Sequence, residues 1–544
     1  MSHQVTTADV PLEQDLYPVL IGPATESEKI AAVKNALEGE KGTFWRAELG
    51  KWAARTVPVE LLVPEMYRDW RPLVRDAILF VVSKLSASRL APKIVEQMSL
   101  GPDMPPEARL LRFIGRVPGL QKIGQVIARN RHLHPRLRRA LIKLENGISD
   151  VPVGEVCSII NQQLHSEIER YAVKIRPRIL SEASVSAVVA FTWKNPETGR
   201  REHGVFKVLK PHIPSCYAED MKILGQLAKY VVRQCGGAGK HAGRLAETLT
   251  EVRLLLEREV DFLREQATLA NSLEEYRSVR GVQIPRVIRC LSTPTITALT
   301  FEKGRKVANP LVVPPQLRWS VASRLARTLL AVPALSQRSH AIFHADPHAG
   351  NLLYDKRANQ LVILDWALTE TLSRKQRRGV VLLVLFMMLR DSHGMTNAIR
   401  ELCQVPSDDR VQLAIIRRHV DELLDALQVT RLPGVMEGTR LLESIALDGI
   451  PFPAALLMFR KAAFTLEGVV EDVAGTKVSM DSLVANYTFA NWKDTLTCLF
   501  TLLSIHDWMS LDWSAVTFAS RMCARTALSP WRWLSGLSPS VDTT

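Results

Sequence analysis

The stretch from His344 to Asn351, with Asp365 further along, constrains the fold of this chain more than any other feature. It reads His-Ala-Asp-Pro-His-Ala-Gly-Asn, and Asp365 follows fourteen residues after Asn351, at the end of the apolar run Leu-Val-Ile-Leu. An Asp, an Asn five residues on and a second Asp after a short strand is a spacing that holds nucleotide phosphates and magnesium. We therefore expect Asp346 to be a catalytic carboxylate, and Asn351 and Asp365 to be magnesium ligands.

The same stretch also contains the pattern H-x-D-x-H, formed by His344, Asp346 and His348, which is compatible with a transition-metal hydrolase. Either a strand or a helix would bring the two histidines to one side. No further His-rich or Cys-rich string stands out to complete such a site. We therefore favour histidines that hydrogen-bond the backbone of the loop.

Residues 184–210 have the pattern of a β-hairpin. Two β-rich runs, 184–193 and 204–210, are separated by a polar turn that contains Pro and Gly at 194–199. A long helix is predicted from Leu245 to Tyr276, and short strands are predicted at 287–291 and 295–301. A mainly helical half then begins near Gln316, so the order of elements is that of an α+β, bilobal, protein-kinase-like fold.

Lys207 lies between apolar residues on the second arm of the hairpin, where its burial is costly unless it is paired. The predicted helix supplies acidic partners, namely Glu251, Glu257, Glu259, Asp261 and Glu265. In a kinase-like lobe such a lysine holds the inner phosphates while a helix Glu orients it. An edge-strand lysine with its head in solvent is the alternative, and Lys210, beside Pro211, is expected at the surface.

A glycine-rich phosphate loop is missing from the first arm of the hairpin. In its place are small residues whose hydroxyls and amides can approach a phosphate but whose Cβ atoms restrict the backbone. The residues expected to contact the nucleotide there are Ala183, Ser184, Val185, Ser186 and Ala187.

The basic charge of the chain limits its partners. There are 70 Lys and Arg against 56 Asp and Glu, a formal net charge of +14. Such a charge attracts phosphates and anionic headgroups, although a solvated basic surface is the alternative. The basic residues are not interleaved with aromatic ones as on a base-stacking surface, so nucleic acid is not expected as a partner.

The cysteines and the N-terminus indicate a reducing compartment. Seven cysteines contain no C-x-x-C pair, and the first residues lack the basic and apolar regions of a secretion signal. We expect a cytoplasmic protein that is peripheral to a membrane and is not secreted.

Two apolar runs, 380–389 and 495–505, are shorter than the ~18 to 20 residues that a membrane span requires. The first is expected to be a buried helix. Tryptophans surround the second, as at a membrane interface, and ordinary helix packing is the alternative. These tryptophans are Trp492, Trp508, Trp513, Trp531 and Trp533.

Together these residues resemble the UbiB/AarF (ADCK-like) family of atypical kinase-like proteins. The positions that match its motifs are the alanine-rich loop at 183–187, Lys207, Glu259-Val-Asp261 with Glu265, residues 344–351 and Asp365. The family's K-x-G-Q marker matches Lys122-Ile-Gly124-Gln125. The resemblance covers residues 107 to 400.

The resemblance implies ATP and magnesium in the site, with Lys207 paired with Glu259, so that both count with Asp346 as catalytic. It also implies that the regulatory segment Lys122 to Gln125 folds over the site and pairs with Glu265 or Asp365. An occluded site of this kind favours ATP hydrolysis, or small-molecule or lipid phosphorylation, in prenyl-quinone or other lipid metabolism. Lipid-biosynthesis enzymes and an anionic membrane surface are the further expected partners.

Four departures from the family pattern leave a second function open. Ala349 replaces a proline, Asp365-Trp-Ala lacks a final glycine, Ala187 stands where Gln or Gly is usual, and Thr268 stands where an Asn closes the E-x-D motif. The alternative is a catalytically weak, nucleotide-sensing pseudokinase that acts as a scaffold for lipid-pathway enzymes.

Five regions are predicted along the chain. Residues 1–105 form a helical region in which no chemistry is evident, and residues 106–175 form the helical extension with the K-x-G-Q motif. Residues 176–305 form the N-lobe, residues 306–480 the mainly helical C-lobe, and residues 481–544 a Trp-rich tail.

Overall fold

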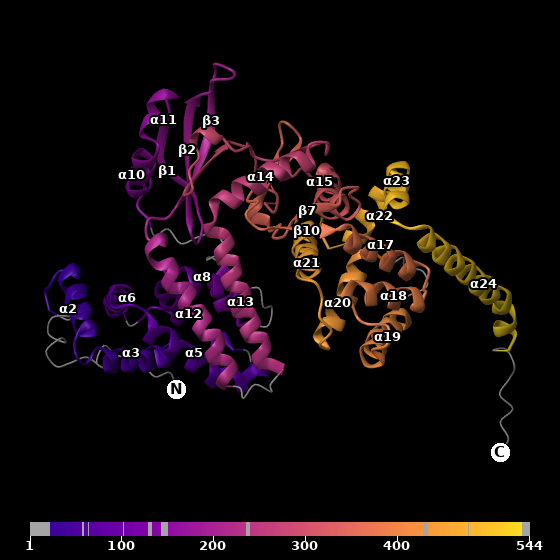
Figure 1. The fold of residues 1–544 in the computed structure, drawn as a ribbon, viewed down its shortest axis with the longest axis horizontal. Coiled ribbons are helices and arrows are strands. Elements are labelled where there is room, and N and C mark those ends of the chain that lie inside the picture. Colours follow the sequence, from indigo (N-terminus) through magenta and orange to yellow (C-terminus); the bar gives the residue numbers. More distant parts are fainter. Residues whose placement is uncertain are drawn as a thin grey trace. The chain divides into compact units, whose positions relative to one another are not determined.

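A four-stranded antiparallel sheet forms the centre of the first part of the chain. Its order is β1 (Lys174–Glu182), β2 (Ser186–Lys194), β3 (Arg201–Leu209) and β5 (Ile296–Thr300). The computed structural model describes residues 22–56, 59–63, 65–101, 103–128, 133–142, 151–234, 240–309, 311–427, 433–476 and 478–535. Figure 1 shows the two compact units into which the chain divides. Unit 1 is Met1–Gln266 with Val287–Phe301, and unit 2 is Ala267–Arg286 with Glu302–Thr544.

Aromatic packing fixes the hairpin at the centre of this sheet. Phe191 on β2 and Phe206 on β3 stack with their ring centroids 3.9 Å apart. A Cβ atom at Gly204 would lie only 2.4 Å from the ring of Phe191, so the neighbouring strand requires glycine there. The predicted hairpin is therefore confirmed, and β1, which was not assigned as a separate strand, extends it.

Helices make up the rest of unit 1. In Figure 1, α10 and α11 lie beside the sheet, and the α10 residues Val156 and Ile160 join its core. A second core contains buried residues from α2, α3, α5, α6, α12 and α13, and a third core contains buried residues from α7, α8 and α9. The bounds are α2 (Glu26–Glu38), α3 (Gly42–Thr56), α4 (Val59–Leu62), α5 (Arg71–Lys84), α6 (Ala87–Ser99), α7 (Pro106–Ile114), α8 (Pro118–Ala128), α9 (Pro135–Ile142), α10 (Val153–Gln163), α11 (His165–Arg170), α12 (Ile213–Gln234) and α13 (Lys240–Val260).

The long helix predicted from Leu245 to Tyr276 is wrong as a single element. It is two helices, α13 and α14 (Phe262–Tyr276), divided at Asp261. The side chain of Asp261 accepts a hydrogen bond from the backbone N–H of Arg264 at 2.9 Å, as an N-cap does. The strand predicted at 287–291 is also wrong, because only a bridge from Val287 to Leu299 and a 3₁₀ turn at Arg289–Leu291 form there.

Unit 2 contains two small sheets. One has the order β4 (Val282–Gln283), β9 (Gln360–Ile363), β8 (Leu352–Asp355) and β6 (Arg305–Lys306), and the other pairs β7 (His340–His344) with β10 (Thr369–Ser373). The strand predicted before Asp365 is therefore confirmed as β9. Its helices are α15 (Arg318–Ala326), continued by a π turn at Arg327–Ala331, α16 (Val332–Ala334), α17 (Arg374–Met388), α18 (Ser392–Cys403), α19 (Arg410–Ala426), α20 (Val435–Leu447), α21 (Ala454–Ala474), α22 (Met480–Ala490), α23 (Trp492–Leu502) and α24 (Ile505–Ser535).

A capping box starts α17, which carries the first of the two apolar runs. Ser373 and Gln376 exchange side-chain to backbone hydrogen bonds at 3.3 and 2.9 Å. Leu383 and Met387 are buried in the core that α17 shares with α18, α19 and α20. This run is therefore a buried helix, as predicted. Among the described helices, none has both the length and the apolar content that a membrane crossing needs.

Two carboxyl groups lie together at the start of α20. Asp481 accepts a hydrogen bond from the backbone N–H of Met436 at 2.9 Å, and Glu437 accepts one from Gly434 at 3.1 Å. Burial, followed by the hydrogen bond with Glu437, raises the pKa of the Asp481 carboxyl to about 7. Asp481 is therefore protonated in the folded protein over a range of pH in which it is ionised in the unfolded chain.

The pKa of Asp481 predicts a loss of stability as the pH rises. A carboxyl whose pKa is raised on folding stabilises the folded state at low pH, and this contribution disappears as the pH rises through about 7. Asp481→Asn, which keeps the acceptor for Met436, should flatten the dependence of the melting temperature on pH between about 5 and 8. The exposed carboxylate variant Asp408→Asn is the control. Equal pH dependence in wild type and Asp481→Asn would contradict this assignment.

Candidate functional site

The loop that was predicted to contact phosphate is a tight connection between β1 and β2. The backbone N–H of Ala183 donates to the carbonyl of Ser186 at 2.8 Å, and the carbonyl of Val185 accepts from the backbone N–H of Lys210 at 2.9 Å. Ser184 is buried at the apex, and its hydroxyl donates to Oε2 of Glu259 at 3.0 Å. Of the five residues predicted for this loop, Ser186 and Ala187 belong to β2.

Lys210 is buried at the base of this loop and is not the surface residue that was predicted. Its Nζ lies 2.9 Å from Oε1 of Glu182, and both side chains are almost completely buried. The proximity of Pro211 suggested a turn in solvent. Instead, the register places Leu209 opposite Ser186, at the foot of the loop, so Lys210 follows directly beneath it.

Lys207 lies in an interior strand of the sheet, between Val188 on β2 and Thr297 on β5. Its Nζ lies 2.6 Å from Oε1 of Glu265 and 5.5 Å from the centroid of the Phe262 ring. The prediction that Lys207 is paired is confirmed, but the predicted partner, Glu259, is wrong. The physical reason is that α14 starts afresh after Asp261, and its first turn carries Phe262 and Glu265 to β3.

Glu259 instead binds the segment predicted to be regulatory. Lys122, on α8, forms an ion pair and hydrogen bond with Oε1 of Glu259, and the side chains of both residues are largely buried. The other carboxylate oxygen of Glu259 accepts from Ser184. Of the two partners predicted for Lys122, Glu265 is wrong, because its carboxylate binds Lys207. Gly124 and Gln125 are buried on the same helix.

The histidines of unit 2 hold the loop around Asp346. Nδ1 of His344 accepts from the backbone N–H of Asp346 at 3.2 Å, so Nε2 carries the proton and donates to the carbonyl of Leu364 at 3.1 Å. Burial lowers the pKa of His344, which favours this neutral form. Nδ1 of His348 likewise accepts from the backbone N–H of Gly350 at 3.0 Å.

The two histidines are therefore structural residues of the loop, as we favoured. No group of three or more His, Cys, Asp or Glu side chains able to hold a metal occurs among the residues that the structure describes. The H-x-D-x-H string thus does not form a transition-metal site in that part of the chain.

Asn351 and Asp365 are brought together by the backbone of unit 2. The carbonyl of Asn351 accepts from the N–H of Leu364 at 2.8 Å, which places the residue before Asp365 against Asn351. Asp365 has a φ of 53°, in the left-handed region, a backbone strain that is typical of functional sites. Trp366 is buried and donates from Nε1 to the carbonyl of Ile363 at 3.1 Å.

These donors fit a magnesium ion, because carboxylate and amide oxygens are the ligands that it prefers. Asp346 follows β7, Asn351 directly precedes β8 and Asp365 follows β9, so short strands of unit 2 flank all three residues. Within unit 1, a separate group of residues consists of Lys207, Glu259, Glu265 and the Ser184 loop. The buried Glu182–Lys210 pair was missed by sequence reasoning, although Glu182 ends β1 and Lys210 directly follows β3, the two strands that flank β2.

Comparisons with known proteins identify a known domain in the middle of the chain. Residues 143–399 match the family model described as the ABC1 atypical kinase-like domain. These residues therefore form an ABC1 atypical kinase-like domain, and the resemblance to the UbiB/AarF (ADCK-like) family is confirmed. The predicted α+β kinase-like fold class is thereby confirmed as well.

Relatives of this chain occur in Synechocystis and in Arabidopsis thaliana. It is 24% identical over 359 residues to the uncharacterized protein sll1770 of Synechocystis, over 65% of this chain and 59% of that protein. It is 23% identical over 312 residues to the chloroplastic protein ACTIVITY OF BC1 COMPLEX KINASE 8 of Arabidopsis thaliana, over 55% and 38%. It is 24% identical over 362 residues to the chloroplastic protein ACTIVITY OF BC1 COMPLEX KINASE 7, over 65% and 50%.

The matches therefore span between 38% and 59% of the length of these relatives.

Among solved structures, the complex of Rv3197 with erythromycin from Mycobacterium tuberculosis is similar at a TM-score of 0.43 and 17% identity. It covers 67% of this chain and 89% of its own.

The buried Glu182–Lys210 pair predicts a characteristic stability pattern. Lys210→Met leaves the Glu182 carboxylate buried without this partner and should destabilise unit 1 by about 3 to 5 kcal/mol. The double variant Glu182→Leu/Lys210→Met should recover most of this loss, because an apolar pair needs no counter-ion. Urea unfolding measures both free energies.

The exposed pair Glu60–Arg75 provides the matched control, and its double variant should change stability by only about 1 kcal/mol or less. A Lys210→Met loss as small as that of the control would show that the pair is not a buried charge pair.

Proposed function

We propose that the chain is a magnesium-dependent, ATP-binding atypical kinase-like enzyme that hydrolyses ATP or phosphorylates a small molecule or lipid. In this proposal Lys207 holds the phosphates, Glu265 orients Lys207, and Asp346 is the catalytic carboxylate beside the attacking oxygen. Asn351 and Asp365 hold magnesium, which neutralises charge on the transferred phosphoryl group. The match to the ABC1 atypical kinase-like domain supports the coarse assignment.

The observation that carries the proposal is the Lys207–Glu265 pair in the interior of a sheet. A lysine there costs desolvation that an apolar residue would avoid, and an ion pair seldom repays that cost in stability. Its presence at 2.6 Å, with both side chains mostly buried, is best explained by a need for a fixed positive charge. In unit 2, the left-handed backbone of Asp365 similarly reduces the stability of the fold.

We also assign α8 an autoinhibitory role. Glu259 accepts a hydrogen bond from the hydroxyl of Ser184, and Lys122 holds Glu259 in place. Ser184 is the residue of the loop whose side chain is best suited to reach a phosphate. Removal of the lysine should therefore free the loop and raise turnover. The same contact also favours the alternative, a pseudokinase scaffold that binds nucleotide but seldom turns it over.

The substrate class follows from the family resemblance alone. A restricted site suits a small molecule or a lipid better than a protein substrate, and prenyl-quinone or other lipid metabolism is the proposed context. Enzymes of lipid biosynthesis are the proposed protein partners.

Nucleotide binding should require magnesium and Asp365. With MgATP at about 100 times its dissociation constant, the melting temperature should rise by several degrees, and EDTA should remove the rise. Asp365→Asn, which keeps the left-handed backbone because Asn tolerates it, should bind at least about tenfold more weakly. Asp346→Asn should still bind but lose about a hundredfold or more in ATP turnover.

Asp355→Asn, a change of the same size at the end of the neighbouring strand β8, is the control and should behave as wild type. The site assignment fails if wild type shows no shift, or if Asp365→Asn shifts as far. Binding without turnover in wild type would favour the scaffold.

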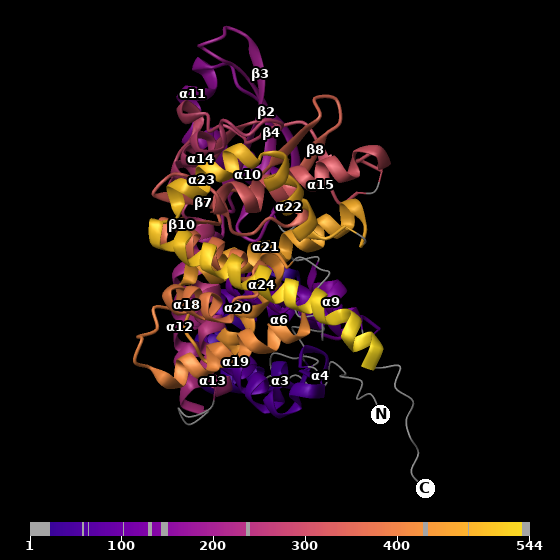
Figure 2. The ribbon, with the colours of Figure 1, turned by 90° about the vertical axis from the view of Figure 1, so that its right-hand side faces the viewer.

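An anionic membrane surface is the proposed partner of the C-terminal helices. Trp492, Leu496 and Phe500 form one exposed stripe along α23 at four-residue spacing. A second exposed stripe on α24 consists of Ile505, Met509, Trp513 and Val516. Figure 2, which faces this side, shows both helices at the surface of unit 2.

Basic residues lie near both ends of α23. Arg374 donates to the carbonyl of Thr501, and Lys493 lies 5.7 Å from the Trp492 ring centroid. Apolar side chains bordered by basic ones suit shallow insertion among anionic headgroups. Trp508 is partly buried in the core, and the side chains of Trp531 and Trp533 lie outside those described.

Binding to lipid vesicles should therefore depend on both stripes and on salt. Sedimentation with anionic vesicles should retain wild type at low salt and release most of it at high salt. Trp492→Ala/Trp513→Ala should reduce binding about tenfold or more, whereas Trp319→Ala, an exposed tryptophan on α15, should not. Binding equal to wild type in the double variant would assign these stripes to protein contacts instead.

A further inference from the structure

Asp220 connects α12 to the start of α8, the helix that carries Lys122. Its Oδ2 accepts a hydrogen bond from the backbone N–H of Gly119 at 2.8 Å, across 101 residues of sequence. Gly119 is in the first turn of α8, where backbone N–H groups lack partners within the helix and the helix dipole favours a negative charge. Asp220 is nearly completely buried there.

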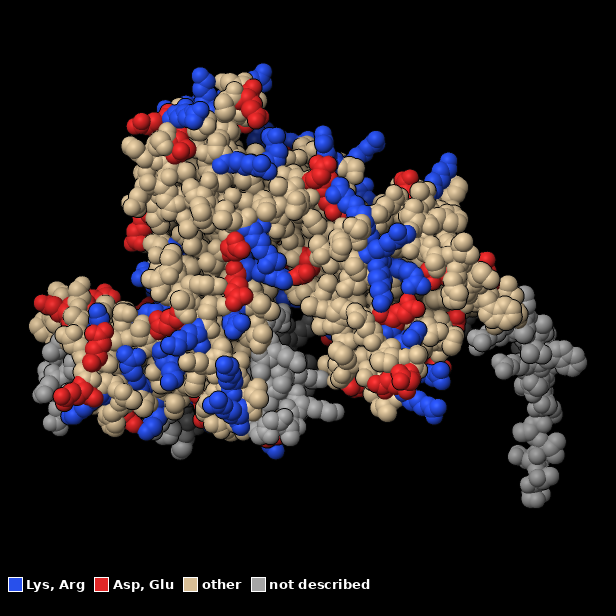
Figure 3. Space-filling model, viewed as in Figure 1, with Lys and Arg blue, Asp and Glu red and all other residues tan. Residues whose placement is uncertain are grey.

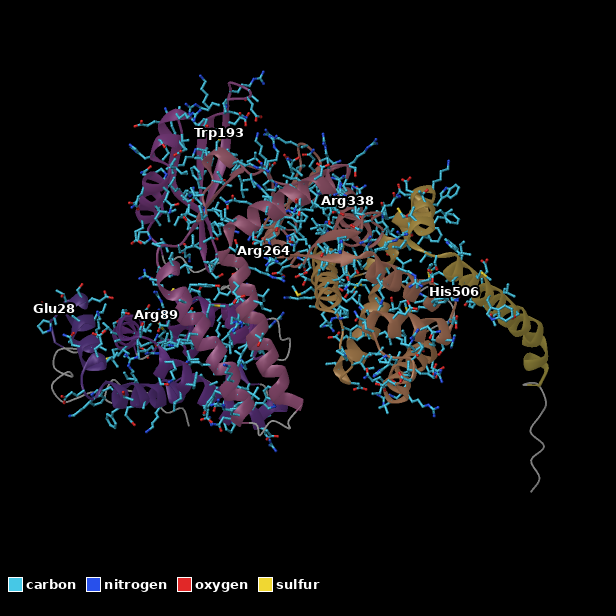
Figure 4. All side chains as sticks on the ribbon, in the orientation of Figure 1. Glu28, Arg89, Trp193, Arg264, Arg338 and His506 are labelled. Atoms are coloured by element: carbon cyan, nitrogen blue, oxygen red, sulfur yellow. The ribbon has the colours of Figure 1, made fainter. Side chains whose placement is uncertain are left out.

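Arg89, on α6, holds this carboxylate from its other side. Its guanidinium lies 2.6 Å from Oδ1 of Asp220 and 3.2 Å from Oε2 of Glu219. Glu219 in turn accepts from the backbone N–H of Ser86 at 2.5 Å and from its hydroxyl at 3.0 Å. Figure 4 shows Arg89 among the N-terminal helices, in the region where the sequence suggested no chemistry.

The space around Gly119 shows how closely α8 and α12 approach. A Cβ atom there would lie 3.3 Å from Oδ2 of Asp220 and 3.5 Å from the Leu224 side chain. Glycine therefore permits the carboxylate to reach the helix start. Lys122 is three residues further along the same rigid helix, so the position of Gly119 determines where Lys122 can meet Glu259.

We infer that Arg89 and Asp220 are positioning residues that hold α8 against α12 and thereby maintain the Lys122–Glu259 contact. The inference deepens the autoinhibitory role and rests on the proposed function for its effect on turnover. It assigns the N-terminal helical region a role, since α6 supplies the guanidinium.

Asp220→Asn is the sharpest probe of this arrangement. Both carboxylate oxygens of Asp220 receive donors, but an asparagine offers one acceptor and places an amide N–H against the other donor. Amide hydrogen exchange of residues 120–128 in the full chain should become about tenfold faster or more. Arg89→Met should have the same effect, and Arg89→Lys, which keeps the charge, should restore part of the protection.

Turnover tests whether the effect passes through Lys122. Asp220→Asn and Lys122→Ala should each raise ATP hydrolysis, and the double variant should exceed neither by more than about twofold, because both changes release the same contact. Leu37→Ala, which removes buried packing from α2 in the same core, is the control for general destabilisation.

The outcomes separate this inference from the proposed function. Unchanged exchange in α8, independent effects in the double variant, or equal exchange in Leu37→Ala would overturn the positioning role. If wild type neither binds nor hydrolyses ATP, the proposed function fails, and the exchange of α8 still decides whether Arg89 and Asp220 hold it.

Discussion

The side chain of Asp261 determines how the charged residues of unit 1 are paired. Asp261 caps α14, and α13 ends at the residue before it, Val260. The two helices therefore carry Glu259 and Glu265 to different places. Glu265 reaches the lysine of β3, and Glu259 reaches α8 and the loop before β2. The break between the two helices lies within the acidic motif, which explains why two glutamates six residues apart have separate partners.

The buried ion pairs of unit 1 determine which elements pack against one another. Lys122, Lys207 and Lys210 each have a carboxylate partner from another element, and Arg89 has two. Such pairs add little net stability, because desolvation offsets most of the attraction. A displaced helix, however, would leave a charge buried alone, which costs far more. The pairs thus favour one arrangement of these elements over its competitors.

The sequence was sufficient for the parts of the site that depend on local pattern. The hairpin with Lys207, the strand before Asp365 and the backbone role of His344 and His348 all follow from short spacings and were confirmed. Which carboxylate meets which lysine was not predictable in this way. Lys122 and Glu259 are 137 residues apart, and their meeting depends on how α8, α12 and α13 pack.

Other differences had a local signal that was outweighed. Asp261 followed by Phe-Leu-Arg-Glu is a helix start, but the continuous apolar periodicity on both sides favoured one long helix. Lys210 beside Pro211 is typical of a solvent-exposed turn, and only the strand register shows that it lies beneath the loop. At Asp261 the local N-cap determined where the helices divide, whereas at Lys210 tertiary packing, which no single-residue preference contains, determined the structure.

The two oxygens of Glu259 give the proposed regulation a physical form. One oxygen binds Lys122 and the other accepts the Ser184 hydroxyl, so the helix and the loop share a single carboxylate. A phosphate that took the hydroxyl would remove one of the two donors of Glu259, and a loosened α8 would remove the other. These two effects are reciprocal. The free energy by which phosphate binding weakens the contact between α8 and Glu259 equals the free energy by which that contact weakens phosphate binding. A ligand of α8 could therefore control nucleotide binding without contacting the nucleotide.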